Sequence, residues 1–158
     1  MLLAAVAGIA TACEDSTDPP ITYSATLLGA NERPTAVTTS ATGTFTATLG
    51  ENDILTYNVT FTGLTSNSNN AHIHGPILAT GNAAAGVLIN FNDPNNGRTI
   101  TLGATSGTGS GTIDLKVGPT ATISSDSLKV LLNNAKLYVN VHSVNFGGGE
   151  ILGIITRQ

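Results

Sequence analysis

The sequence predicts a protein of the all-β class, and three observations support that prediction. The 158 residues include 24 Thr, 15 Asn and 18 Gly but only 10% charged residues, a composition that favours strands and polar turns over helices. Apolar and polar residues alternate with a period of two from Thr22 onward, which is typical of strands with one buried face. The length is enough for one domain with a real core once a targeting segment is removed.

The N-terminal residues predict export. Residues 1–12 are apolar or small and precede Cys13, after which the chain becomes acidic and contains prolines. Ala10-Thr11-Ala12-Cys13 resembles the bacterial lipobox, so we expect a lipoprotein signal peptide at 1–12, lipidation of Cys13, a tether at 13–20 and a domain at 21–157. The protein would then be anchored in a membrane through Cys13, facing the periplasm or the cell surface. A plain secretory signal with an incidental cysteine is the alternative.

The strands are predicted where the alternation is strongest. The clearest pair is a hairpin, in which residues 44–49 and 55–61 flank a short loop of residues that tolerate left-handed backbone. Further strands are expected at 23–28, 71–74, 86–91, 99–102, 111–115, 137–142 and 150–156. About nine strands at this spacing predict an Ig-like, Greek-key β-sandwich, with a barrel as the related alternative.

One segment, residues 124–134, has the pattern of a short helix instead. Ser124 and Ser125 precede a cluster of leucines and valine, and two asparagines close the segment. We expect this helix to cover one end of the sandwich. The stretches 65–70, 92–97 and 103–111 are rich in Ser, Asn and Gly and are predicted to be surface loops.

The charge of the chain argues against nucleic acid as a partner. Only six Lys and Arg are present, the net charge is -4, and the basic residues form no patch that would neutralise phosphates. Nucleophilic catalysis also lacks support, because Cys13 precedes the domain and no serine lies in a Gly-x-Ser-x-Gly turn. The sequence therefore favours a protein that is not an enzyme, and no catalytic residue is assigned.

All three histidines of the chain, His72, His74 and His142, fall in predicted strands and are candidate metal ligands. His72 and His74 are two residues apart, so they share a face with Cα atoms roughly 6.5–7 Å apart. His142 ends a strand whose polar face also carries Tyr138 and Asn140. If the two strands are neighbours, the three imidazoles with Glu150 nearby suit copper or zinc, since both metals accept imidazole. Copper is preferred to zinc for an exported protein.

A structural network is the alternative interpretation of the same histidines. In that case each imidazole hydrogen-bonds loop carbonyls or Glu150 and fastens residues 65–75 to residues 143–149. Glu150, at the start of the last strand, and Glu32, at the turn after the first strand, are candidates for an extra ligand or for a partner that orients an imidazole. Tyr138 and Asn140 are candidates for the same supporting role.

Six blocks follow one another in the mature part of this sequence. They are Tyr23-Ser24-Ala25-Thr26-Leu27, Gly29-Ala30-Asn31-Glu32-Arg33-Pro34, Gly43-Thr44-Phe45, Ala71-His72-Ile73-His74-Gly75, Tyr138-Val139-Asn140-Val141-His142-Ser143 and Gly149-Glu150-Ile151-Leu152-Gly153. With these blocks in this order, residues 21–157 resemble the CHRD (chordin) domain, and the chain resembles a bacterial lipoprotein member of that family. The resemblance implies a β-sandwich module of secreted proteins, which binds an unknown protein or envelope partner or has a structural role there.

The competing hypothesis is a copper protein that performs redox or metal-storage work through the three histidines. The His-x-His strand also resembles the copper-ligand strand of copper-zinc superoxide dismutases. The disulfide pair and the long zinc loop of those enzymes have no counterpart in this sequence. Superoxide dismutase activity is therefore not expected, whereas a mononuclear copper site is compatible with the sequence.

Overall fold

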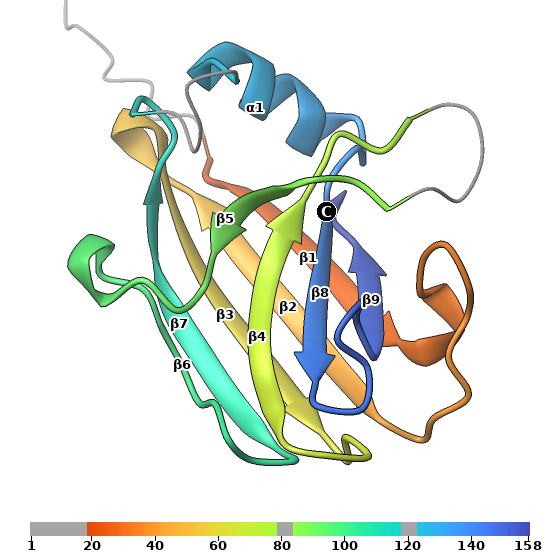
Figure 1. The fold of residues 1–158 in the computed structure, drawn as a ribbon. Helices are drawn as coiled ribbons and strands as arrows, with labels where there is room; N and C mark the ends of the chain where they lie inside the picture. Colours follow the sequence, from red (N-terminus) through yellow and green to blue (C-terminus); the bar gives the residue numbers. More distant parts are fainter. Residues whose placement is uncertain (1–18, 79–83, 118–122) are drawn as a thin grey trace, which may run out of the picture.

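The computed structural model describes residues 19–78, 84–117 and 123–158. Within these residues one α-helix and ten strands are present, and the strands form a single antiparallel sheet that curls around a core (Figure 1). The prediction of an all-β fold with one short helix is confirmed. The strands are β1 (Ile21–Leu28), β2 (Thr42–Leu49), β3 (Ile54–Thr62), β4 (Ser68–His74), β5 (Val87–Asn90), β6 (Thr99–Ile100), β7 (Gly107–Asp114), β8 (Tyr138–Ser143), β9 (Ile151–Ile154) and β10 (Thr156–Arg157).

The sheet has two halves that face each other across the core, as in a sandwich. Its strand order is β5-β4-β8-β9-β1-β2-β3-β7-β6, and β10 pairs with β1. The halves are joined where β9 meets β1, through the single residue pair Leu28 and Leu152. In Figure 1, β4, β5, β8 and β9 form the front half, and β1, β2 and β3 lie behind it.

The predicted hairpin is confirmed as β2 and β3, which pair from Thr42 with Thr62 to Leu49 with Leu55. The connection contains the 3-10 helix η2 (Glu51–Asp53), in which Asn52 has φ 61°. Asparagine is one of the few side chains that tolerate this left-handed conformation.

The inward-facing side chains form one contiguous hydrophobic core. Its centre is an aromatic stack in which the ring centroid of Tyr57 lies 4.7 Å from that of Phe91, and Phe45 lies within 6.2 Å of both. Because Phe45 and Tyr57 belong to the rear half while Phe91 follows β5, the stack joins the two halves. Aromatic packing of this kind contributes about 1 kcal/mol per pair beyond the burial of the rings.

Two predicted loops are wrong in part, because strand pairing prevails over their composition. β7 begins at Gly107 rather than at residue 111 and pairs with β3 along its whole length. A Cβ at Gly109 would lie 2.9 Å from the carbonyl oxygen of Thr99, so glycine is needed where β6 pairs with β7. Likewise, β4 begins at Ser68, which pairs with Ser143.

The predicted helix is confirmed as α1 (Ser125–Asn133). Ser124 caps its first turn, since its hydroxyl oxygen accepts a hydrogen bond of 3.2 Å from the backbone N–H of Ser127. Leu128 and Leu132 are buried against the core, and the helix lies across one end of the curled sheet in Figure 1.

The N-terminal predictions concern residues that the structure does not describe. The predicted signal peptide 1–12, Cys13 and most of the tether at 13–20 lie outside the described residues. Among the helices that are described, none has both the length and the apolar character needed to cross a membrane.

Candidate metal centre on the outer face of the sheet

The antiparallel pairing of β4 with β8 brings the three histidines together. His72 pairs with Asn140, His74 with Tyr138, and Asn70 with His142. Side chains alternate between the two faces of a strand, so these polar residues share the outer face. The residues between them, which are Ala71, Ile73, Val139 and Val141, fill the core on the inner face.

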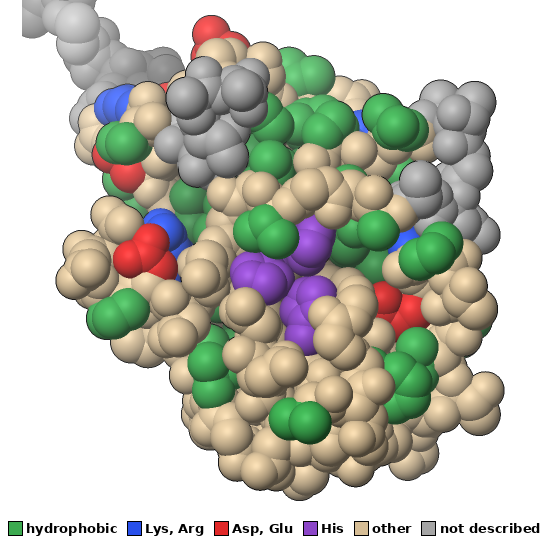
Figure 2. Space-filling model, viewed as in Figure 1, with side chains coloured by type: hydrophobic (Ala, Val, Ile, Leu, Met, Phe, Trp, Pro, Cys, Tyr) green, Lys and Arg blue, Asp and Glu red, His purple; other side chains and the backbone are tan. Residues whose placement is uncertain are grey.

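The histidines are buried although they lie on the outer face, because loops surround them. His72 is 9% exposed, and His74 and His142 are each 7% exposed. Figure 2 shows the three imidazoles gathered at one spot, with their edges visible from the solvent. A small molecule can therefore reach the cluster, whereas a large one would meet the surrounding loops first.

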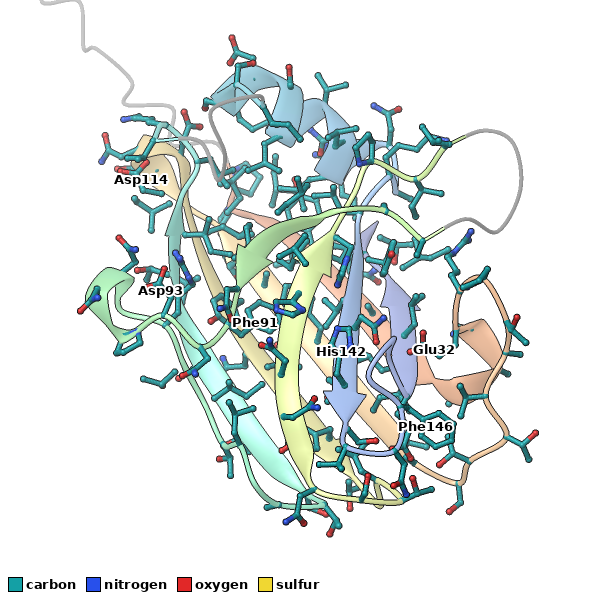
Figure 3. The ribbon with its side chains drawn as sticks, in the orientation of Figure 1. Glu32, Phe91, Asp93, Asp114, His142 and Phe146 are labelled. Atoms are coloured by element: carbon teal, nitrogen blue, oxygen red, sulfur yellow. The ribbon has the colours of Figure 1, made fainter. Side chains whose placement is uncertain are left out.

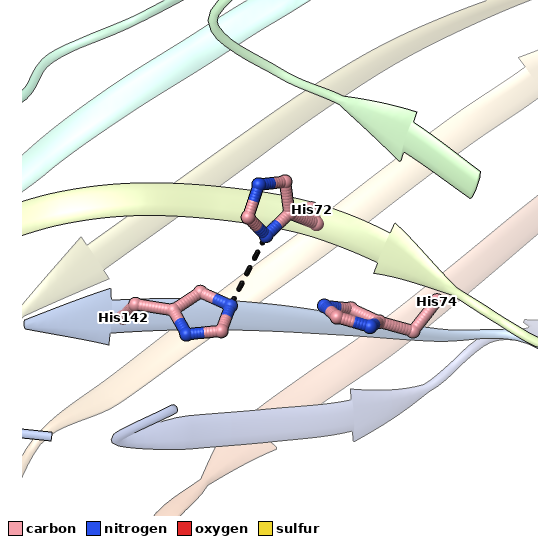
Figure 4. A group of neighbouring side chains, drawn as sticks. All are labelled: His72, His74 and His142. Carbon is pink, nitrogen blue, oxygen red and sulfur yellow. Dashed lines mark hydrogen bonds between the residues drawn. The ribbon is translucent and has the colours of Figure 1, made fainter. Parts of the chain in front are cut away.

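The imidazoles are close enough to share one metal ion (Figure 4). The Nδ1 atom of His72 lies 3.1 Å from the Nε2 atom of His142. One ring nitrogen from each histidine lies within 4.8 Å of the corresponding nitrogens of the other two. In the described part of the chain, this potential metal-binding group consists of the three histidines and includes neither Glu32 nor Glu150.

Backbone carbonyls determine which ring nitrogens are free to bind a metal. His74 Nδ1 lies 2.9 Å from the carbonyl oxygen of Ala85, and His142 Nδ1 lies 3.0 Å from that of Gly147. A carbonyl oxygen can only accept, so both Nδ1 atoms donate a proton and both Nε2 atoms carry a lone pair. Histidines that ligate metals are oriented by hydrogen bonds of this kind.

The buried imidazoles are neutral at pH 7, as metal binding requires. Burial lowers the pKa of His72 to about 4, and the neighbouring His142 and His74 lower it further in the same direction. Burial also lowers the pKa of His74 and His142, although the Ala85 and Gly147 carbonyls oppose the effect. All three rings therefore offer lone pairs rather than positive charges.

Tyr138 supports His74 in two ways. Its ring stacks on the imidazole with centroids 5.0 Å apart and an interplanar angle of 2°. Its hydroxyl accepts a hydrogen bond of 2.9 Å from the backbone N–H of Ala85, the residue whose carbonyl accepts from His74. Tyr138 thus holds both the imidazole and the backbone group that orients it.

Asn140 connects the outer face that carries the histidines to Glu32. Figure 3 labels Glu32 and one of those histidines, His142. The amide Nδ2 of Asn140 donates hydrogen bonds of 3.3 Å to Glu32 Oε2 and 3.4 Å to the carbonyl oxygen of Gly148. Gly149 leaves room for this side chain, because a Cβ there would lie 2.3 Å from Asn140 Nδ2 and its φ is +127°. The glycine run before Glu150 therefore serves the packing of Asn140.

Glu32 is 5% exposed, and burial raises the pKa of its carboxyl group to about 7. The pKa of Glu32 is therefore higher in the folded protein than in the unfolded chain, so the folded state binds the proton more tightly. This proton binding adds to the free energy of unfolding at acid pH, and the contribution is lost as the pH rises through 7. We expect Glu32→Gln to be more stable than the wild type by about 2 kcal/mol at pH 8 but similar to it at pH 5.

Urea unfolding at the two pH values measures this difference. The comparison at each pH cancels the titration of the histidines, which is common to both proteins. Glu51→Gln, at an exposed position, is the control and should not alter the pH dependence. An equal change in stability for Glu32→Gln at pH 5 and pH 8 would contradict the raised pKa.

Glu150 belongs to a different cluster from the histidines. It is fully buried, and within the described residues its carboxylate accepts four hydrogen bonds from three residues. Oε1 accepts from Thr39 Oγ1 at 2.9 Å and from the N–H of Thr65 at 2.8 Å, and Oε2 accepts from Thr65 Oγ1 at 3.2 Å and Ser143 Oγ at 2.5 Å. Glu150 thus fastens β8 to two loops, and its hydrogen-bond partners include none of the histidines.

The sequence predicted loop carbonyls as possible partners of the imidazoles, but it did not identify them as those of Ala85 and Gly147. Every residue has a carbonyl, so no side-chain pattern reveals which one will meet an imidazole. The only signal was the glycine run that includes Gly147, which indicated a tight loop next to His142.

Comparison with known protein families finds the CHRD domain, whose model matches residues 23–155. Neither the comparison with curated proteins nor the comparison with solved structures finds a match.

Proposed function

Because the chain belongs to the CHRD domain family, we propose that it is an exported binding module of the cell envelope whose ligand is a metal ion. His72, His74 and His142 bind this ion, which is copper in preference to zinc. Membership of the family supports a binding module as the class of function. The histidine cluster supports a metal ion as the species that this module binds.

The observation that carries this proposal is the state of His74 Nε2. This atom is buried and has no hydrogen-bond partner among the described residues, while His74 Nδ1 is engaged with the Ala85 carbonyl. A buried polar atom without a partner costs about 1–3 kcal/mol. A metal ion bound to this lone pair explains why the atom is buried.

The three ligand atoms are Nε2 of His74, Nε2 of His142 and Nδ1 of His72. In the metal-free protein His72 Nδ1 donates a hydrogen bond to His142 Nε2, so metal binding requires the proton of His72 to move to its Nε2 atom. In a tetrahedral site with metal–nitrogen bonds of about 2.0–2.1 Å, the nitrogens lie roughly 3.3–3.4 Å apart. His72 and His142 are already near that separation at 3.1 Å. The ligand nitrogens of the three histidines lie within 4.8 Å of one another. Rotation of the imidazoles that moves His74 Nε2 toward the other two nitrogens would bring all three to the separation of a metal site.

The donor set favours copper over zinc. It consists of three imidazoles, which both metals accept, and divalent copper binds a given nitrogen site more tightly than zinc does. The competing structural role is supported by the hydrogen bonds from His74 and His142 to loop carbonyls. The hydrogen bond between His72 and His142 also belongs to such a network. None of these bonds uses His74 Nε2, which a purely structural network would leave buried without a partner.

The proposal includes export and anchoring of the protein. The apolar residues 1–12, Cys13 and the acidic, proline-containing tether support a lipoprotein held at the periplasmic or outer surface by a lipid on Cys13. A domain tethered in this way can bind metal or an envelope partner outside the cytoplasm. A protein or envelope partner is proposed on the family resemblance alone.

The test is the metal content of the full chain, purified without a histidine tag. After loading with Cu²⁺ and dialysis we expect about one equivalent of copper, because one cluster of three neutral imidazoles is available. His72→Ala should lose most of that copper. A wild-type content below about 0.1 equivalent for both copper and zinc would contradict the proposal and favour the structural network.

A further inference from the structure

Three buried polar atoms without a hydrogen-bond partner among the described residues belong to neighbouring side chains. They are His74 Nε2, Asn140 Oδ1 and Glu32 Oε1. Buried polar groups are nearly always paired, so a group of unpaired atoms calls for an explanation. The proposed metal ion accounts for His74 Nε2 but not for Asn140 Oδ1 or Glu32 Oε1, and of these two atoms only Asn140 Oδ1 belongs to the strands that carry the histidines.

Asn140 lies on the same face of the sheet as the three histidines. It pairs directly with His72 across the ladder and lies on the same face as Tyr138 and His142. Its Nδ2 donates to Glu32 Oε2 and to the Gly148 carbonyl, and these acceptors fix the orientation of the amide. Oδ1 is therefore a buried acceptor that has no donor among the described residues.

The arrangement of the ligands leaves one side of a bound ion open. All three imidazoles project from the same face of β4 and β8, so they hold an ion from the side of the sheet. The described residues add no fourth histidine, cysteine or carboxylate to the group. The edges of the imidazoles reach the solvent in Figure 2, with exposures of only 7–9%.

The charge of such a centre favours anions. Three neutral imidazoles leave the full double positive charge on a divalent ion, unlike a site that contains a carboxylate or thiolate ligand. The small exposure of the rings, 7–9%, favours small anions over large ones.

We infer that the metal ion keeps one exchangeable coordination position, which a water molecule occupies. This water donates a hydrogen bond to Asn140 Oδ1, and a small inorganic anion can replace the water. This inference rests on the proposed function, because it requires the metal ion. It adds a ligand class, the small monoanion, and gives Asn140 the role of a positioning residue for the bound water.

Azide titration of the copper-loaded full chain tests the exchangeable position. We expect a saturable charge-transfer absorption band and a matching change in the electron paramagnetic resonance spectrum, with neither effect in the metal-free protein. Copper content is measured first on the same sample. A sample that holds copper but does not respond to excess azide would overturn the inference and leave the metal site intact, whereas a sample without copper would overturn the proposed function.

Asn140→Leu tests the role of Asn140, because leucine has a similar shape but no acceptor. Water then loses its hydrogen bond and azide displaces it more easily, so azide affinity should rise about tenfold while copper affinity changes by less than about threefold. Asn58→Leu, at an exposed position on β3, is the matched control and should alter neither affinity. Azide affinity that stays at the wild-type value in copper-loaded Asn140→Leu would overturn the role of Asn140; should that variant not fold, the wild-type titration still decides the inference.

Discussion

Replacing His74 by alanine is expected to abolish the rise in melting temperature that Cu²⁺ gives to the wild-type protein. A ligand that binds only the native state stabilises it by about 4 kcal/mol when its concentration is 1,000 times the dissociation constant. For a domain of this size that stabilisation corresponds to a rise on the order of 15 °C. His74 is the most informative position because its Nε2 atom has no other described partner, so the variant removes a ligand without breaking a second contact of that atom.

Differential scanning calorimetry with and without Cu²⁺ measures the effect. Asn69→Ala is the matched control, since Asn69 is exposed on the same strand as His74, and it should retain the full metal-induced rise. A rise in His74→Ala equal to that of the wild type would place the stabilising ion elsewhere. The metal-free proteins also need comparison, because His74→Ala removes the stacking on Tyr138.

The histidine face could be predicted from the sequence because it depends on local geometry. Alternation along a strand places His72 and His74 on one face and His142 on the polar face of its own strand, whatever the rest of the fold does. The sequence did not show whether the strand that carries His72 and His74 lies next to the strand that carries His142. The pairing of β4 with β8 makes these strands neighbours, and it connects residues about 70 positions apart.

The features of the fold and of the site that could not be predicted from the sequence depend on contacts between distant segments of the chain. The stretch 107–110 is rich in glycine and serine, which indicates a loop locally, but pairing with β3 makes it a strand. Glu150 follows a glycine run near His142, which suggested a role beside the imidazoles. Its actual partners, Thr39 and Thr65, come from loops whose positions only the folded chain determines.

Replacing Glu150 by alanine is expected to destabilise the protein by about 4 kcal/mol, among the largest effects of any single substitution in this chain. The carboxylate is fully buried and accepts four hydrogen bonds. Alanine would leave the backbone N–H of Thr65 and the hydroxyls of Thr39 and Ser143 without their acceptor. Ser143 is buried, whereas Thr39 is half-buried and Thr65 is exposed. The unsatisfied hydroxyl of Ser143 costs about 1–3 kcal/mol, and the other lost hydrogen bonds and the lost volume add to that cost.

The same substitution should also weaken metal binding, because Glu150 closes the loop that carries Gly147. That loop presents the Gly147 carbonyl to His142 Nδ1, and Ser143, which donates to Glu150, is adjacent to His142. Urea unfolding measures the stability change, with Glu51→Ala at an exposed position as a control that should lie within about 0.5 kcal/mol of the wild type. A stability loss below about 1 kcal/mol for Glu150→Ala would mean that water replaces the carboxylate as acceptor, and the loop around the histidines would then have to be held by other contacts.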